Sequence, residues 1–288
     1  MMIEKKVVGV DIGGSHITAG VINLNERHVI KDSLHRIHVN SKGTAEEILD
    51  AWADTIHELF TTWPDCEKKI GIAMPGPFNY EEGICLIHGV DKFESLYGLN
   101  VKKILAEKLG IPANDILFMN DASCFLKGEV FGGAAIGCNH VAGITLGTGL
   151  GSARFHDGKV YEGFLYCSPY KDGMTEDYIS TRWFLKEYKK RSGISVKNVK
   201  ELCEKISADE TVSQLFAEFG ENLGNILGEY AQTYSCNTIV IGGNIMNTWG
   251  LFYKATEQIL QQLPHPVTVK KAILGEEGAL VGAASLWE

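Results

Sequence analysis

The sequence predicts an α/β protein made of two similar halves that face a cleft. A short glycine-rich turn lies between two apolar runs at residues 7–18, and a second such turn lies between apolar runs at 141–152. Each turn opens a series of strands and helices in the same order, which indicates duplicated α/β halves. The chain has 288 residues, 45% hydrophobic and 22% charged, enough to form two folded domains with separate cores.

The first half opens with a strand meander, because three apolar runs are separated by turn residues. A helix follows Thr44, where Thr44 and Glu47 have the spacing of a capping box ahead of apolar residues at helical periodicity. Shorter apolar runs then alternate with amphipathic segments. The expected elements are strands 5–11, 17–24 and 29–39, helix 44–63, strand 69–74, helix 101–109, strand 116–120 and helix 122–131.

The second half repeats this order with additional helices. An Asp157–Gly158 turn joins two of its strands, and Gly242–Gly243 ends another strand. The expected elements are strands 140–146, 152–156 and 159–162, helices 176–191, 197–206 and 210–235, strand 238–241, helix 248–262, strand 268–274 and a closing helix from about residue 278. We therefore expect a smaller domain at 1–120 and a larger one at 121–288, with the closing helix packed back on the smaller domain.

The two glycine turns have the character of phosphate-binding loops. Glycines let backbone N–H groups approach an anion closely, and successive N–H groups form a concave anion nest. Two nests in one chain indicate a polyphosphate held from both sides, which points to ATP. Asp11 opens the first turn, and a carboxylate there would repel phosphates unless Mg²⁺ intervened, so we expect Asp11 to hold Mg²⁺ through water. The alternative is an ordinary turn aspartate.

Asn120 and Asp121 follow a buried strand and precede a helix. One interpretation is a helix N-cap, a position that Asn and Asp favour. The other follows from position, because α/β sheets bind ligands beyond the carboxyl ends of their strands. There an amide hydrogen-bonds a substrate hydroxyl, and a carboxylate accepts a proton while it orients the attacking oxygen.

Three further positions have a structural and a functional interpretation. The Pro-Gly-Pro turn around Gly76 is either a rigid turn or a pocket wall. Gly242 and Gly243 either end a strand or let a flat adenosine pass close to the backbone. Glu176 and Ser180 are expected on one helix face, where Glu176 is an ordinary first-turn acid in the simplest interpretation.

Composition narrows the class of protein. The net charge of −9 argues against nucleic-acid binding, and the seven cysteines have no C-x-x-C spacing, as expected of reduced thiols in a cytoplasmic protein. No apolar run is long enough to cross a membrane, and no signal-peptide core is recognisable. The nine histidines show no metal-ligand spacing, and no Walker A motif or nucleophile elbow occurs.

The motif set resembles that of the ROK family, bacterial sugar kinases and repressors with the actin/hexokinase-like (ribonuclease H-like) ATPase fold. The matching segments, which together span essentially the whole chain, are Asp11-Ile-Gly-Gly-Ser, Gly71-Ile-Ala-Met-Pro-Gly-Pro, Asn120-Asp121-Ala, Leu146-Gly-Thr-Gly-Leu-Gly and Ile241-Gly-Gly.

The resemblance implies a role for each matching residue. Asp121 would be the catalytic base, and Gly76, Asn120, Asp121 and Glu176 would bind sugar. The ATP-binding residues would be Asp11, Gly13, Gly14, Ser15, Gly147, Thr148, Gly149, Gly242 and Gly243. The implied activity is phosphorylation of a sugar hydroxyl by Mg²⁺-ATP in a cytoplasmic homodimer, with ATP and sugar bound in the cleft.

The chain departs from the family pattern after the second glycine turn. The family's G-E-x-G-H and cysteine-rich zinc motif do not fit into the short segment between Gly163 and Glu176, so we expect no structural zinc. The identity of the sugar is therefore not carried over from the family. Family repressors carry a helix-turn-helix before the first glycine turn, and the few residues here predict none. The alternative function is a sugar- or nucleotide-binding regulator without kinase activity.

Overall fold

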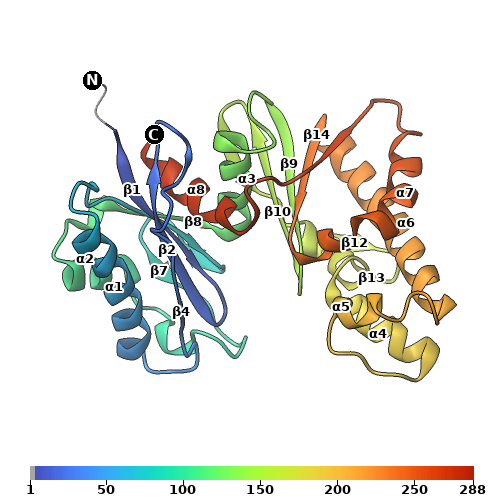
Figure 1. Cartoon of the computed structure of the whole chain (residues 1–288), viewed down its shortest axis with the longest axis horizontal. Coiled ribbons are helices and arrows are strands. Elements are labelled where there is room, and N and C mark those ends of the chain that lie inside the picture. Colours follow the sequence, from blue (N-terminus) through green and yellow to red (C-terminus); the bar gives the residue numbers. More distant parts are fainter. Residues whose placement is uncertain (1–3) are drawn as a thin grey trace. The chain divides into compact units, whose positions relative to one another are not determined.

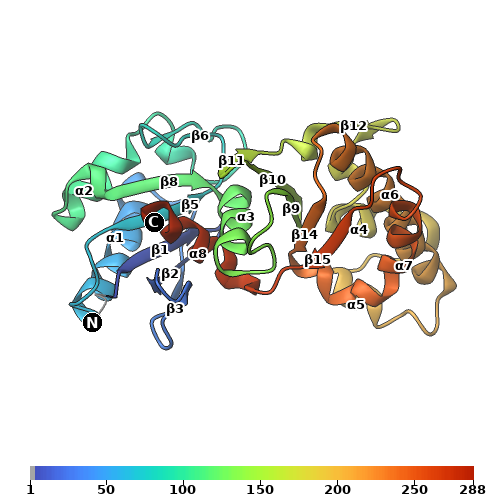
Figure 2. The same cartoon turned by 90° about the horizontal axis from the view of Figure 1, so that it is seen from above.

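The computed structural model describes residues 4–288, which form two compact units. Unit 1 contains the described residues up to Ile136 together with Glu276–Glu288, and unit 2 contains Gly137–Gly275. The main sheets of the two units share one topology, with two antiparallel pairings followed by two parallel ones (Figures 1 and 2). Among residues 4–288, no helix combines the length and apolarity required to cross a bilayer.

The sheet of unit 1 has the order β3-β2-β1-β5-β8, and β4 also pairs with β2. Strand β1 is antiparallel to β2 and parallel to β5, and β5 is parallel to β8. The strands are β1 (Lys6–Ile12), β2 (His16–Asn23), β3 (His28–Val29), β4 (His35–His38), β5 (Ile70–Met74) and β8 (Ile116–Asn120), with a separate hairpin of β6 (Phe78–Asn79) and β7 (Ile84–Cys85).

Helices cover both faces of this sheet (Figure 1). Helices α1 (Ala45–Thr62) and α2 (Val101–Leu109) pack in one core with Ile70, Ile72 and Met74 of β5. Because side chains alternate along a strand, Ala73 faces the other way, toward α3 (Asp121–Gly132) and α8 (Gly278–Ala284). The capping box predicted for α1 is confirmed, since Thr44 Oγ1 accepts the Glu47 N–H and the Glu47 carboxylate accepts the Thr44 N–H.

Glycines allow α8 to pack unusually close to the rest of unit 1. A Cβ atom added to Gly71 would lie 1.9 Å from the carbonyl oxygen of Ala283, and one added to Gly9 would lie 2.3 Å from that of Leu280. On the helix itself, a Cβ atom at Gly282 would lie 1.8 Å from the Cys124 carbonyl oxygen. The backbone of α8 therefore rests directly on β1, β5 and α3.

Unit 2 repeats the topology, with the strand order β11-β10-β9-β14-β15. One face of its sheet is buried under an aromatic-rich core that includes Phe184, Phe219 and Phe252. The elements are β9 (His140–Leu146), β10 (Leu150–His156), β11 (Lys159–Glu162), β14 (Thr238–Gly242) and β15 (Thr268–Lys271), the hairpin of β12 (Pro169–Tyr170) and β13 (Gly173–Met174), and helices α4 (Thr181–Ser192), α5 (Val199–Cys203), α6 (Glu210–Thr233) and α7 (Trp249–Leu260).

Two expected elements are wrong in detail. The strand expected at 29–39 is divided into β3 and β4, because Asp32 has φ of +66° and the Ser33 hydroxyl accepts the Val21 N–H. The helix expected at 176–191 begins only at Thr181, because the Ser180 side chain caps it by accepting the Trp183 N–H. Glu176 therefore lies before this helix and does not share a helix face with Ser180.

The compact units divide at a different place from the boundary expected after residue 120. Helix α3 belongs to unit 1 because it packs on α8, where Gly128 approaches Gly278 closely enough that an added Cβ would lie 2.1 Å from its carbonyl oxygen. The C-terminal helix α8 also contacts β1 and β5 of the same unit.

The close packing of α8 predicts that Gly282→Ala lowers the melting temperature. A methyl group at this position overlaps the Cys124 carbonyl, and such overpacking costs about 1–3 kcal/mol or more. Gly250→Ala in α7 is the matched control, because its added Cβ meets no atom within 4 Å. That variant should gain roughly 0.5–1 kcal/mol from the lower helix cost of Ala. Equal melting temperatures of the two variants would contradict the packing argument.

Candidate functional site

Polar residues gather at the carboxyl edge of the unit 1 sheet. Strands β1, β5 and β8 are parallel neighbours, with Asp11 paired to Ala73 and Met74 paired to Asn120 in the register. Asp11, the turn containing Gly76 and the Asn120–Asp121 pair consequently leave the sheet along one edge. The sequence prediction that these residues lie at the carboxyl ends of strands is confirmed for this unit, with Asp11 one residue before the end of β1 and Asn120 the last residue of β8. Their functional roles stay predictions.

Asp11 is a partly buried carboxylate in unfavourable surroundings. Loss of solvation raises its pKa from 3.8 to about 6, and the negative charges of Asp121 and Glu276 act in the same direction. Arg36 opposes this effect, although its guanidinium also pairs with Glu276 at 2.9 Å. The edge of the sheet thus concentrates negative charge with little compensation from the protein.

Asn120 caps helix α3 with its side-chain oxygen and uses its side-chain NH₂ group for another contact. Its Oδ1 accepts the Ser123 N–H at 3.2 Å, so the N-cap interpretation is confirmed. Its Nδ2 donates to the Tyr80 hydroxyl at 3.3 Å, and that hydroxyl donates to the Met74 carbonyl at 3.2 Å. A Cβ atom at Gly76 would lie 3.2 Å from the same hydroxyl, so Tyr80 joins Asn120 to the Gly76 turn.

Asp121 is exposed at the first position of α3. Its Oδ1 accepts the Ala122 N–H at 2.8 Å, and the positive end of the helix dipole favours a carboxylate there. The side chain therefore has a fixed anchor and a free face toward solvent. A carboxylate with this arrangement can accept a proton from a bound hydroxyl.

The first glycine turn joins β1 to β2 and leaves backbone donors open. Its Gly13 N–H donates to the His16 carbonyl at 2.9 Å, which closes the turn. Among residues 4–288, the N–H groups of Gly14 and Ser15 have no hydrogen-bond acceptor. Open successive N–H groups are what an anion nest requires.

The second glycine turn, between β9 and β10, has the same character. Its Gly147 N–H donates to the Gly149 carbonyl at 3.0 Å, and the Gly147 carbonyl accepts the Thr181 N–H at 2.9 Å. The N–H groups of Thr148 and Gly149 have no acceptor within the described part of the chain. This turn therefore also offers adjacent free donors at the edge of its own sheet.

Glu176 lies against the second glycine turn. Its Oε2 accepts the Leu150 N–H at 2.7 Å, and its Oε1 pairs with Arg182. A Cβ atom at Gly149 would lie 2.4 Å from Glu176 Oε2, so glycine is required where the carboxylate approaches. In unit 2, Glu176 thus supports the turn directly.

Gly242 and Gly243 meet the same edge of the unit 2 sheet. Gly242 ends β14 opposite Thr145 of β9, and Gly243 has φ of +93°. A Cβ atom at Gly243 would lie 2.3 Å from the Leu146 carbonyl oxygen. The fold therefore requires glycine at 243 irrespective of any ligand.

Sequence reasoning missed three residues at these two edges. Tyr80 bridges Asn120 and the Gly76 turn, and its place after the Pro-Gly-Pro turn is a weak signal in the sequence. Arg36 reaches Asp11 from β4, which no local pattern indicated. Arg182 follows the cap of α4 by two residues and pairs with Glu176, six residues earlier, across a segment that the sequence had predicted to be helical.

Comparison with known proteins identifies relatives along the whole chain. The sequence model of the ROK family matches residues 7–288. An N-acetyl-D-glucosamine kinase of Mannheimia succiniciproducens is 26% identical, with 97% of this chain and 98% of that protein aligned. These matches cover nearly all of the described structure.

Solved structures of similar fold include both enzymes and a regulator. A ROK family glucokinase from Streptomyces griseus, in complex with glucose and AMPPNP, has a TM-score of 0.75 and 24% identity over 98% of each chain. A ROK family transcriptional regulator, a homologue of the E. coli MLC protein, has a TM-score of 0.80 and 18% identity over 98% of this chain and 77% of its own. The prediction of a duplicated actin/hexokinase-like α/β fold is confirmed.

The raised pKa of Asp11 predicts a pH-dependent stability difference between the protein and Asp11→Asn. An acid whose pKa is higher in the folded state destabilises the fold once it ionises, so stability falls as pH rises from about 4 through about 6. The neutral variant escapes this loss. It should be more stable above pH 7, by up to about 3 kcal/mol, with the difference vanishing near pH 4.

Denaturant titrations at pH 4, 5, 6 and 7.5 measure this difference. Asp54→Asn, which removes an exposed carboxylate from α1, is the matched control and should show no comparable trend. A constant difference between the protein and Asp11→Asn at all pH values would contradict the assignment to Asp11.

Proposed function

The chain belongs to the ROK family, and on this premise we propose that it is an ATP-dependent sugar kinase with Asp121 as the catalytic base. The observation that carries the proposal is the group of Asp11, Asn120 and Asp121 at the carboxyl edge of the unit 1 sheet. This group combines a proton acceptor, a hydroxyl-binding amide and a carboxylate suited to a cation.

Asp121 would act on the acceptor hydroxyl. As the sugar oxygen attacks the γ-phosphorus of ATP, its proton passes to the Asp121 carboxylate, and the bond from the γ-phosphorus to the bridging oxygen breaks to release ADP. Asn120 and the Gly76 turn would bind neighbouring sugar hydroxyls, with Tyr80 holding the Asn120 amide in place. Positioning of this kind supplies much of the catalysis in phosphoryl transfer, because the transition state is loose.

Each glycine turn would bind phosphate groups of ATP. In unit 1 the donors would come from Gly13, Gly14 and Ser15. In unit 2 they would be the open N–H groups of Thr148 and Gly149, together with Gly147. Gly242 and Gly243 would lie beside adenosine, where the absence of side chains leaves the backbone accessible. This assignment agrees with the predicted division, in which the N-terminal domain binds sugar and the C-terminal domain binds adenosine.

The residues present fit Mg²⁺. Asp11 offers the oxygen ligand that Mg²⁺ prefers, and the uncompensated negative charge around it favours a divalent cation over an ammonium or guanidinium group. When bound, Mg²⁺ neutralises charge on the transferred phosphates. Asp11 would hold the ion through water while Asp121 remains available to the sugar.

The supporting relatives narrow the substrate to a small sugar. The named kinase relative acts on N-acetyl-D-glucosamine, and the glucokinase structure contains glucose. We propose a cytoplasmic homodimer that binds no nucleic acid, in keeping with the net charge of −9. A regulator is the second candidate, favoured by the structural likeness to a transcriptional regulator and by the short segment between Gly163 and Glu176.

Asp121→Asn tests the proposed reaction. The amide oxygen of Asn can still accept the Ala122 N–H, so the start of α3 is preserved while the base is lost. We expect kcat to fall by about 10²–10⁴-fold with little change in the KM for sugar. Coupled release of ADP from Mg²⁺-ATP is the measurement, across glucose, mannose, fructose, allose, N-acetylglucosamine and N-acetylmannosamine.

The same assay separates the kinase from the regulator. Sugar-dependent turnover that disappears in Asp121→Asn supports the kinase and identifies the preferred sugar. Binding of sugar or ATP without turnover for any of the six sugars would favour the regulator. Asp115→Asn is the control substitution and should leave turnover unchanged. Asp115 is half-buried and lies in the short turn Ala113–Asp115 before β8.

Glu176 is proposed to bind sugar by resemblance, but its contacts also indicate that it orders the second glycine turn. We therefore expect Glu176→Ala to raise the KM for ATP by about tenfold, because a hydrogen bond from Leu150 to a charged group is lost. Glu176→Gln keeps an acceptor for that N–H and should restore most of the ATP affinity. A change confined to the KM for sugar in both variants would contradict the positioning role.

A further inference from the structure

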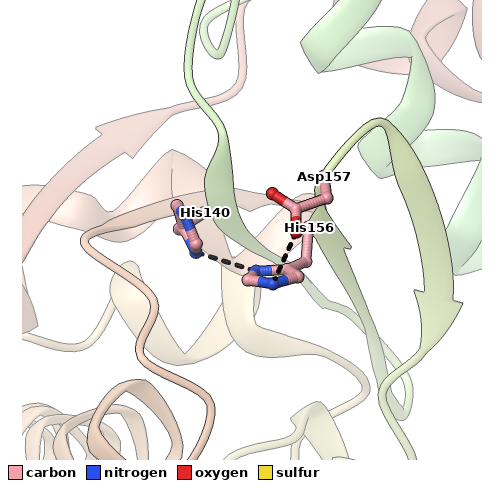
Figure 3. Close-up of side chains that lie close together, drawn as sticks. All are labelled: His140, His156 and Asp157. Atoms are coloured by element: carbon pink, nitrogen blue, oxygen red, sulfur yellow. Dashed lines mark hydrogen bonds and ion pairs between the residues drawn. The ribbon is translucent and has the colours of Figure 1, made fainter.

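A second group of polar side chains lies at the opposite end of the β9–β10 hairpin from the glycine turn. His140 begins β9 and His156 ends β10, and the two residues are direct partners in the antiparallel register. Direct partners present their side chains on one face with Cβ atoms about 4.5–5.5 Å apart. Asp157 follows His156 in the turn to β11, and Figure 3 shows its carboxylate directed at the His156 ring.

The three side chains place their donor atoms close together. His140 Nδ1 and His156 Nδ1 are 2.8 Å apart, and His156 Nε2 is 3.2 Å from Asp157 Oδ2 (Figure 3). One ligand atom from each residue lies within 4.8 Å of the others. His140 is half-buried, whereas His156 and Asp157 are exposed, so the cluster is accessible to ions from solvent.

The backbone around this cluster is well defined. Asp157 and Gly158 both have positive φ, at +48° and +79°, as in the tight hairpin turns that fit twisted strands. The His140 carbonyl also accepts the Asn237 N–H at 3.2 Å, which ties the start of β9 to the chain entering β14. The three side chains consequently emerge from fixed positions on one sheet.

The Nδ1 atoms of His140 and His156, 2.8 Å apart, would repel each other if both carried only lone pairs, so a proton or a metal ion must lie between them. A proton satisfies the pair if one ring donates and the other accepts, with His156 Nε2–H donating to Asp157. A metal ion satisfies it equally well, because zinc–nitrogen bonds of 2.0–2.1 Å in a tetrahedral site place two nitrogens roughly 3.3 Å apart. The rings need to separate by only about half an ångström, and exposed side chains can do so.

We propose that His140, His156 and Asp157 form a binding site for a divalent transition-metal ion such as Zn²⁺ or Ni²⁺. The two imidazoles suit these ions, whereas Mg²⁺ and Ca²⁺ prefer oxygen ligands throughout. The ion would bind between the two Nδ1 atoms, and Asp157, which lies at Nε2 of His156, would orient that ring as an outer-shell partner. Water or a small anion would complete the coordination. The site is separate from the proposed catalytic residues, so it stands or falls independently of the proposed function.

Neighbouring positive charges do not block the site. Arg154, two residues before His156, lies over the Tyr234 ring at 3.9 Å and over the Tyr161 ring at 5.7 Å. Lys159 is the hairpin partner of His156 and is exposed, so its long side chain can extend into solvent. The Asp157 carboxylate offsets part of the charge of an incoming cation.

A metal at this site would join β9 to the β10–β11 hairpin. The ligands come from the outer end of the sheet, about 20 Å along the strands from the glycine turn at 147–149, given the rise per residue of an extended strand. Binding at such a point stabilises the folded unit by mass action without touching the turn. We therefore expect a metal-dependent increase in melting temperature.

Isothermal titration calorimetry on the full chain, made without a histidine tag and stripped with EDTA, tests the site with NiCl₂ and ZnCl₂. We expect one ion per chain. His140→Gln and His156→Gln should each weaken binding by at least about tenfold, the loss typical even of outer-shell partners. Asp157→Asn should also weaken binding, and it keeps the turn because Asn tolerates positive φ.

Two matched variants control for other donors. His38→Gln alters the His16–His38 pair, a cross-strand pair whose ring centroids are 5.3 Å apart and which has no third ligand within the described residues. Cys167→Ser removes an exposed thiol. Both should bind metal as the unmodified protein does.

The outcomes separate clearly. Loss of binding and of the metal-dependent melting shift in His140→Gln and His156→Gln, with both controls unaffected, supports the site. Undiminished binding in these variants, binding lost only in a control, or no binding of either ion would overturn it. If metal-free His140→Gln is itself less stable, His156→Gln decides, because that side chain is exposed.

Discussion

The parallel pairing of β1, β5 and β8 is the constraint on which the candidate site of unit 1 depends. Parallel strands end at a common edge, so the register that pairs Asp11 with Ala73 and Met74 with Asn120 also fixes where their side chains lie. Helix α8 packs directly on one face of these strands and supports the register, because Gly9 and Gly71 have no side chains to keep its backbone away from the sheet. A C-terminal helix thus supports residues that stand near the start of the chain.

The repeated topology explains why each unit carries a glycine turn with open N–H groups. In both units an antiparallel hairpin precedes the parallel strands, so the turn of the hairpin lies at the edge where the parallel strands end. Strand ends and turn therefore converge by topology alone. In unit 2 this convergence brings Gly243 against Leu146 and Glu176 against Gly149, two contacts that tolerate no Cβ atom.

The sequence predicted the elements and their order well, because apolar periodicity, the capping box at Thr44 and turn residues are local signals. It predicted which residues end the parallel strands for the same reason. It did not predict the break at Asp32, whose positive φ depends on the contact of Ser33 with Val21. Tyr80 and Arg36 were missed because Asn120 and Asp11 are distant from them in sequence. Arg182 was missed because the helix was expected to begin at 176 and not at Thr181, and the His140–His156 pair required the strand register to be known.

The charge around Asp11 bears on what unit 1 can bind. The negative charges of Asp121 and Glu276 both act on the Asp11 carboxylate. The guanidinium of Arg36 opposes them, but it is also paired with Glu276. Repulsion and lost solvation make the ionised form of Asp11 costly, and a fold selected for stability alone would replace it with a neutral residue. A divalent cation reverses the balance, because it favours the ionised carboxylate and converts the repulsion into attraction. The unfavourable surroundings of the ionised Asp11 carboxylate therefore agree with the cation-binding role proposed for this residue.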